Sequence, residues 1–152
     1  MADDEAIKTS VLIAAVIADL PYYNERAKRD ETAKYAAAEL TQLAHDDPDS
    51  VLVATMGSQI VGFCISKYDD ATIWLSWFGV APANRSTGMG RRLLEALELT
   101  VRRRGAHKIW CDTRTDNVRS QAVIQRFGFR RITEIANHWY GQDFVLWEKL
   151  VD

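Results

Sequence analysis

The junction at residues 80–94 constrains this chain more than any other part of its sequence. A strand-like run ends at Val80, a glycine-containing loop follows, and an amphipathic helix opens directly from that loop. The first turn of a helix has free N–H groups and a partial positive charge, so it attracts anions. Gly88 and Gly90 leave the backbone accessible, and Arg85 adds a full positive charge. The segment therefore predicts an anion site, most plausibly for a pyrophosphate.

This loop differs from two well-known phosphate-binding motifs. A Walker loop would continue with Gly-Lys-Ser/Thr, and a dinucleotide fingerprint would have the spacing Gly-x-Gly-x-x-Gly. Here the spacing is Arg-x-x-Gly-x-Gly. The alternative interpretation is an ordinary turn before a surface helix, and the loop alone does not exclude it.

The N-terminal quarter of the chain has helical periodicity. The apolar run Val11–Leu20 predicts a buried amphipathic helix that stops near Pro21. A second helix is expected after the polar stretch Asn24–Asp30, with Asp30 as its N-cap. Its apolar positions are Ala33, Ala36, Leu40 and Leu43, and it ends at His45-Asp46-Asp47-Pro48.

Beyond these helices the pattern changes to strands separated by two further helices. The first two strands flank the hairpin turn Met56–Gln59, and Gly79 in the third indicates a bulge or a close backbone approach. The expected elements are strands at 51–55, 60–65 and 72–80, a helix at 88–104, a strand at 108–113, a helix at 117–126, and strands at 129–135 and 144–150. The order ααβββαβαββ predicts an α/β fold with a mixed sheet flanked by helices, in one domain over residues 1–152.

Composition narrows the classes of partner. The chain has 152 residues, of which 47% are hydrophobic and 26% charged, and its net charge is -2. This balance favours a soluble protein with no affinity for nucleic acid or membranes. Arg102–Arg104 is interpreted as a solvated helix end that favours the helix dipole.

The two cysteines predict small buried side chains in a reducing cytoplasm. Cys64 and Cys111 each lie in an apolar, strand-like run. They form neither a metal-binding spacing nor a disulfide framework, so we expect no metal site. The apolar run Val11–Ala18 is preceded by acidic residues and is too short to span a bilayer, so it is not interpreted as a signal or membrane segment.

Two motifs together resemble a known family. The pattern Val-x-Pro-x-x-Arg-x-x-Gly-x-Gly-x-x-Leu-Leu at residues 80–94 is similar to the acyl-CoA signature of the GNAT superfamily of N-acetyltransferases. Downstream, Asn117, Ser120 and Gly128-Phe129 resemble the second motif of that family. The order of elements from about Val51 onward also fits, although the first strand of the family is short or absent here.

The resemblance implies an enzyme that transfers the acetyl group of acetyl-CoA to a primary amine of a small molecule or a protein. The amine would attack directly, through a tetrahedral intermediate. Phe78 and Val80 would bind the pantetheine arm through the backbone, and Asn117 would contact the pantetheine or the acceptor. The pyrophosphate would be surrounded by Arg85, Gly88, Met89, Gly90 and Arg91.

The chain departs from the family where a proton donor often stands. Many members carry a tyrosine seven residues after the asparagine, and this chain has Ile124. A lysine-like amine has a pKa of about 10.4, so a base must take its proton, and the third strand offers no carboxylate. Asp112 and His138 are the candidate bases, and Tyr140 is a candidate acid or base. Each has a structural alternative: a cap or ion-pair partner, an exposed strand histidine, and a packed aromatic.

Three function classes therefore remain to be weighed. The first is the N-acetyltransferase, with acetyl-CoA and an unidentified amine as partners. The second is a CoA-binding regulatory module without turnover, favoured by Ile124 and the missing strand carboxylate. The third is an RNA-associated protein, for which the acidic chain gives little support. A homodimer is compatible with the sequence, which does not decide the oligomeric state.

Overall fold

A computed structural model describes residues 1–151 and contains one six-stranded sheet with the strand order β1-β2-β3-β4-β6-β5. The elements are α1 (Asp3–Ala18), α2 (Glu25–Lys34), α3 (Ala37–Asp46), β1 (Val51–Met56), β2 (Gln59–Asp69), β3 (Thr72–Val80), η1 (Pro82–Asn84), α4 (Met89–Arg103), β4 (Lys108–Arg114), α5 (Val118–Arg126), β5 (Arg130–Ile135), η2 (Trp139–Gly141) and β6 (Phe144–Leu150).

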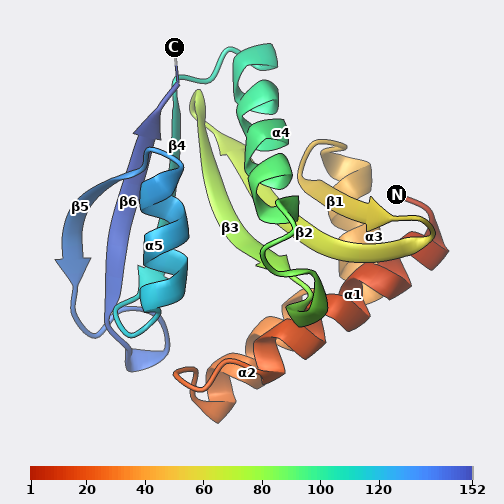
Figure 1. Ribbon diagram of the computed structural model, residues 1–152, viewed down its shortest axis with the longest axis horizontal. Coiled ribbons are helices and arrows are strands. Elements are labelled where there is room, and N and C mark those ends of the chain that lie inside the picture. The colour runs from red at the N-terminus through yellow and green to blue at the C-terminus, as the bar shows by residue number, and fades with distance from the viewer. Residues whose placement is uncertain (152) are drawn as a thin grey trace.

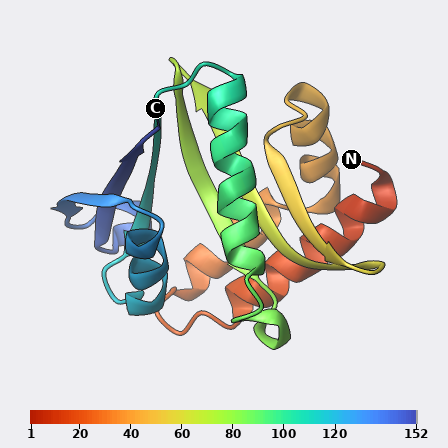
Figure 2. The same ribbon diagram turned by 45° about the horizontal axis from the view of Figure 1, so that its top comes forward.

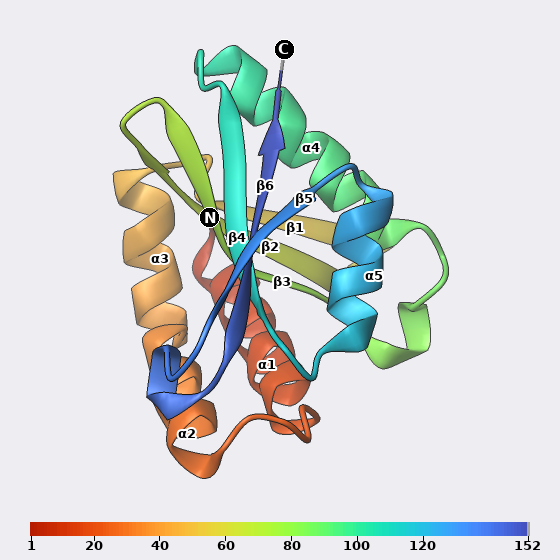
Figure 3. The ribbon, with the colours of Figure 1, turned by 90° about the vertical axis from the view of Figure 1, so that its left-hand side faces the viewer.

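Helices cover both faces of the sheet. Helices α1 to α3 lie on one face and α4 and α5 on the other (Figures 1 and 3). The apolar stripes predicted from the sequence supply both cores: Ile13 and Ile17 of α1 pack in one cluster, and Leu93 and Leu97 of α4 in the other. The mixed α/β fold expected from the sequence is confirmed.

The two middle strands separate after a short parallel pairing. Strand β3 pairs with β4 only at Thr72 to Trp74, and the two strands then diverge (Figures 1 and 2). On its other side β3 pairs with β2 as far as Val80, and Ser76 is the extra residue of a bulge in that ladder. The carboxyl half of β3 therefore has an edge without a strand partner, in the middle of the sheet.

The N-terminal helices differ from the sequence prediction. Helix α1 begins at Asp3 instead of Val11, with three acidic residues in its first turn, where the helix dipole favours them. The single helix expected after Asp30 is two helices. Asn24 is the true cap of α2, because its Oδ1 accepts a hydrogen bond from the Ala27 N–H, and Asp30 lies inside the helix. The break follows because Tyr35 leaves helical geometry and turns into the core.

Other local predictions hold. Strands β1 and β2 form the expected hairpin, in which Met56 faces Gln59. The expected close approach at Gly79 is confirmed, because a Cβ there would lie 2.7 Å from Phe63 Cζ. Cys64 and Cys111 are buried free thiols, and burial raises the pKa of the Cys64 thiol to about 12.

The basic end of α4 is held by ion pairs. Arg103 pairs with Asp49, and Arg104 pairs with Asp47 at 2.6 Å in the turn before β1. Within residues 1–151 no helix is long and apolar enough to cross a membrane. The same residues contain no group of three or more His, Cys, Asp or Glu side chains arranged to hold a metal ion.

Candidate active site

A cavity of about 730 Å³ opens where β3 and β4 diverge. The start of α4 and the length of α5 line one side, and the end of α1, the following loop and α2 line the other. Figure 2 shows these elements around the split in the sheet. The cavity therefore joins the predicted phosphate loop to residues far away in the sequence.

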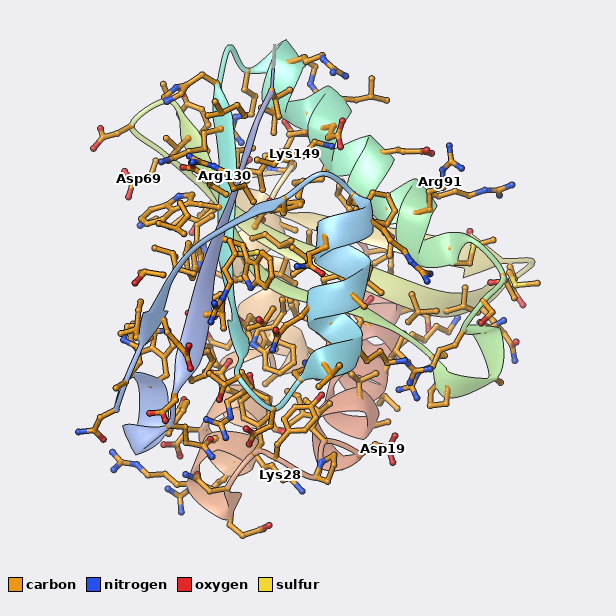
Figure 4. All side chains as sticks on the ribbon, turned by 60° about the vertical axis from the view of Figure 1, so that its left-hand side comes forward. Asp19, Lys28, Asp69, Arg91, Arg130 and Lys149 are labelled. Carbon is orange, nitrogen blue, oxygen red and sulfur yellow. The ribbon has the colours of Figure 1, made fainter. Side chains whose placement is uncertain are left out.

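The phosphate end of the cavity is rich in arginine. Arg85 lies 3.8 Å from Asp19, which directly follows α1, and Arg91 in the first turn of α4 pairs with Glu95 at 2.6 Å. Figure 4 labels Asp19 and Arg91. Arg119 and Arg126 of α5 also line the cavity, and the sequence argument missed both. Two arginines beside the start of α4 and two on α5 therefore give this cavity an anion-attracting wall.

The two glycines of the loop have different structural roles. Gly88 has a φ of +84° and caps α4 in the left-handed conformation, with open space where a Cβ would lie. A Cβ on Gly90 would lie 3.0 Å from Phe78 Cζ and 3.6 Å from Val80 Cγ2. Gly90 therefore allows the start of α4 to pack closely on β3, and a side chain there would require the Phe78 ring to shift.

The middle of the cavity is formed by the unpaired half of β3 and by α5. Phe78 and Val80 pack with the apolar cluster beneath α4, and both line the cavity. Asn117 also lines it, but its Oδ1 accepts a hydrogen bond from Ser120 N at 3.0 Å and caps α5. Ile124, at the position where a tyrosine is common, is buried in the same wall.

A carboxylate that the sequence argument did not select occupies the other end. Glu31 of α2 lines the cavity and accepts two hydrogen bonds, from Trp77 Nε1 at 2.6 Å and from the Tyr140 hydroxyl at 2.9 Å. Burial, together with this bond to Glu31, raises the pKa of Tyr140 to about 12. No sequence signal connects Glu31 with partners this far along the chain.

Asp112 is the second carboxylate at this end. It lies on β4 beyond the last residue that pairs with β3, and its Oδ2 accepts a hydrogen bond from Trp139 Nε1 at 2.7 Å. His138 Nε2 lies 3.8 Å from the same oxygen. Burial raises the pKa of Asp112, although Trp139 and His138 oppose the effect.

The structure brings together nearly all of the predicted site residues. Those that line the cavity are Phe78, Val80, Arg85, Gly88, Gly90, Arg91, Asn117, Asp112 and Tyr140. Met89 and His138 do not line it: Met89 is the first residue of α4, and the His138 ring packs on Trp139 and Phe144 instead. The cavity is also lined by aromatic side chains, among them Tyr22, Tyr23, Trp74, Trp77 and Trp139.

Comparison with known proteins decides the family. The sequence matches the family model described as the acetyltransferase (GNAT) family over residues 16–129. The chain belongs to the GNAT acetyltransferase family. Among curated proteins, it is 30% identical over 99 residues to the mycothiol acetyltransferase of Beutenbergia cavernae, which is 65% of this chain and 30% of that protein. It is 29% identical over 87 residues to the ribosomal protein bS18-alanine N-acetyltransferase of Escherichia coli, 56% of this chain and 57% of that protein.

Solved structures of GNAT proteins share the whole fold. The PaiA N-acetyltransferase of Thermoplasma acidophilum, solved with coenzyme A, superposes with a TM-score of 0.81 at 17% identity, over 99% of this chain and 95% of that one. Ard1 of Thermoplasma volcanium gives a TM-score of 0.79 at 21% identity, over 100% and 95%. By contrast, the chain spans only 30% to 57% of the length of the curated relatives that it matches.

Proposed function

We propose that this GNAT protein is an acetyl-CoA-dependent N-acetyltransferase that acetylates a primary amine. The observation that carries the proposal is the polarity of a single cavity. Arg85 and Arg91 lie beside the N-terminus of α4, and Arg119 and Arg126 of α5 line the same cavity. The carboxylates Glu31 and Asp112 line it from α2 and β4, where Lys34 and Arg114 are also present, and the unpaired edge of β3 forms part of its wall. An anionic acyl donor and a cationic acceptor would thus meet at the split in the sheet.

Acetyl-CoA would enter with its phosphates at the start of α4. Arg85, Arg91 and the backbone around Gly88 to Gly90 would hold the pyrophosphate, and Arg119 and Arg126 of α5 would add charge. The pantetheine amides would then pair with the free edge of β3 near Phe78 and Val80, as an added strand would. This placement directs the thioester toward Asp112.

Asp112 is the base that we favour for the attacking amine. It lies in the cavity on the strand opposite the free edge of β3, and its raised pKa makes it a better proton acceptor than an ordinary aspartate. His138 and Trp139 would orient its carboxylate. A free backbone N–H near the end of β3 would stabilise the tetrahedral oxyanion.

Tyr140 is assigned a positioning role in this proposal. A thiol has a reference pKa of about 8.5, so its thiolate is a weak base and can leave without a general acid. A hydroxyl whose pKa is raised to about 12 is a poor proton donor to such a group. Because Tyr140 donates its hydrogen bond to Glu31, it would hold that carboxylate in place.

The CoA-binding module without turnover is the competing proposal. One support for this proposal was the absence of a carboxylate from β3. However, Glu31 of α2 and Asp112 of β4 place two carboxylates in the cavity. Turnover is therefore the better supported of the two. Buried free thiols also fit a reducing cytoplasm, where we propose that the protein acts.

Release of free CoA thiol from acetyl-CoA in the presence of a panel of amines tests the function. We expect amine-dependent thiol release, and mass spectrometry should find one added acetyl group on the acceptor. Asp112→Asn should bind acetyl-CoA but lose turnover. Tight acetyl-CoA binding with no thiol release for any amine would favour the regulatory module instead.

A further inference from the structure

Glu31 carries a charge that no cation of the protein neutralises directly. Its two hydrogen-bond donors, Trp77 Nε1 and the Tyr140 hydroxyl, are both neutral, and it forms no salt bridge within residues 1–151. Lys34, one turn further along α2, also lines the cavity, and its Nζ lies 5.2 Å from the centroid of the Tyr35 ring without pairing with Glu31. A fixed carboxylate of this kind in a cavity wall favours a cationic ligand.

The surroundings of Glu31 are also suited to an ammonium group. The rings of Tyr23 and Tyr35 lie 5.8 and 6.4 Å from the Trp77 ring, so three aromatic side chains stand together beside the carboxylate. Aromatic faces attract cations. Tyr35 is 3% exposed, lines the cavity, and its hydroxyl has no hydrogen-bond partner within the described chain. This buried hydroxyl therefore has unused hydrogen-bonding capacity beside the cavity.

Two carboxylates from different elements line the same cavity. Asp112 comes from β4 and Glu31 from α2, both line the cavity, and the charge on each affects the Tyr23 hydroxyl. Only one carboxylate is needed to take a proton from the attacking nitrogen. The other remains available to bind a second positive charge on the same molecule.

Hydrogen bonds restrict the opening of the acceptor end, which is the part of the cavity lined by Glu31 and Asp112. Asn24 Nδ2 donates to the Tyr140 carbonyl oxygen at 3.3 Å, and Gln142 Nε2 donates to the Tyr22 carbonyl oxygen at 3.0 Å. With the bond from Tyr140 to Glu31, these contacts join the loop after α1 to the loop around η2. An extended polypeptide could pass between these loops only by breaking the contacts, whereas a small amine would not need to.

We propose that the acceptor is a small primary amine that carries a second cationic group, as an α,ω-diamine does. One ammonium would bind between Glu31 and the rings of Tyr23, Tyr35 and Trp77. The other ammonium would lose one proton to Asp112 and attack the thioester carbonyl as the neutral amine, so that a C–N bond forms. The C–S bond then breaks, and the CoA thiolate takes the second proton that the nitrogen sheds and leaves as thiol. The transfer step rests on the proposed function, but binding of the diamine does not.

Calorimetric titration into the protein saturated with CoA measures this binding without turnover. We expect 1,4-diaminobutane to bind at least about tenfold more tightly than butylamine, which has the same chain length and one charge fewer. Glu31→Gln should remove that preference. Glu39→Gln, an exposed glutamate on α3 outside the cavity, should retain it and controls for the change in net charge.

Several results would overturn the proposal. If the wild-type protein binds 1,4-diaminobutane and butylamine with equal affinity, the proposal is overturned, even if Glu31→Gln fails to fold. An equal loss of both affinities in Glu31→Gln would assign Glu31 a merely structural role. A higher kcat/KM for a peptide with an N-terminal alanine than for any diamine from three to six carbons would contradict the closed acceptor end.

The same measurements separate this proposal from the proposed function. A diamine preference without any thiol release would leave the cation site standing and remove the acetyltransferase activity. Efficient acetylation of butylamine and 1,4-diaminobutane alike would leave the activity standing and remove the cation site.

Discussion

Replacing Gly90 tests whether the start of α4 must pack closely on β3. Alanine at this position would ordinarily stabilise a helix by about 0.5–1 kcal/mol relative to glycine. Here a Cβ would lie 3.0 Å from Phe78 Cζ, so even alanine requires the ring to move. Valine adds two more carbons, and overpacking of this kind costs about 1–3 kcal/mol.

Gly90→Val should therefore lower both stability and ligand affinity. For a domain of this size, a loss of about 1–3 kcal/mol lowers Tm by about 2–12 °C, so the fold should survive. Because the displaced Phe78 lies on the proposed pantetheine path, acetyl-CoA binding should weaken more than about tenfold, or about 1.4 kcal/mol. Thermal unfolding and calorimetric titration measure the two effects on one sample.

Two further variants isolate the cause. Gly88→Ala meets no atom within 4 Å, so its cost should come only from the left-handed backbone, about 1–2 kcal/mol. In a Phe78→Leu background, which lacks the Cζ atom, Gly90→Val should cost clearly less stability than in the wild type. Equal costs in both backgrounds would refute the packing argument, and unchanged acetyl-CoA affinity in Gly90→Val would place the pantetheine path away from Phe78.

Three other expectations concern the ligand and the catalytic end. Acetyl-CoA at a hundred times its Kd should stabilise the protein by about 2.7 kcal/mol, and the absence of any rise in Tm at millimolar ligand would remove the proposed donor site. Burial raises the pKa of Asp112 in the folded protein above its unfolded value of about 3.9. The protonated carboxyl therefore contributes fully to the free energy of unfolding below about pH 3.9, and this contribution is lost as the pH rises through the folded pKa. Asp112→Asn should consequently raise Tm at pH 7, with a smaller gain near pH 4, while turnover falls at least about a hundredfold. A lower Tm of the variant at pH 7 would contradict a net cost of burying the ionised Asp112 carboxylate. Tyr140→Phe should leave the single-turnover rate at saturating amine within about threefold of wild type, because we assign Tyr140 a positioning role and not that of the general acid. A loss of about a hundredfold or more would show that Tyr140 acts as the general acid.

The phosphate end could be predicted from the sequence because its chemistry is local. The arginine, the two glycines and the start of the helix lie within a few residues of one another, and backbone geometry alone brings them together. The apolar stripe of α4 and the strand hairpin are local for the same reason. Even here the role of Gly90 needed the structure, since its constraint is the Phe78 ring on another element.

The acceptor end depends on contacts that no local pattern encodes. The hydrogen bonds of Glu31 join residues separated by 46 and 109 positions, and those of Asn24 and Gln142 span 116 and 120. Local spacing also predicted Asp30 as a helix N-cap, whereas α2 begins at Glu25 and has Asn24 as its N-cap.

The sequence by itself predicted the family, the order of elements from β1 onward and the loop that we propose binds phosphate, because each follows from the spacing of neighbouring residues. The tertiary structure decided how far β3 and β4 stay paired, which carboxylates reach the opening, and how the acceptor end is closed. These features arise from packing between distant segments. A charged side chain such as Glu31 has the same sequence signature on a solvated helix face as in a cavity wall, and only burial against its partners distinguishes the two.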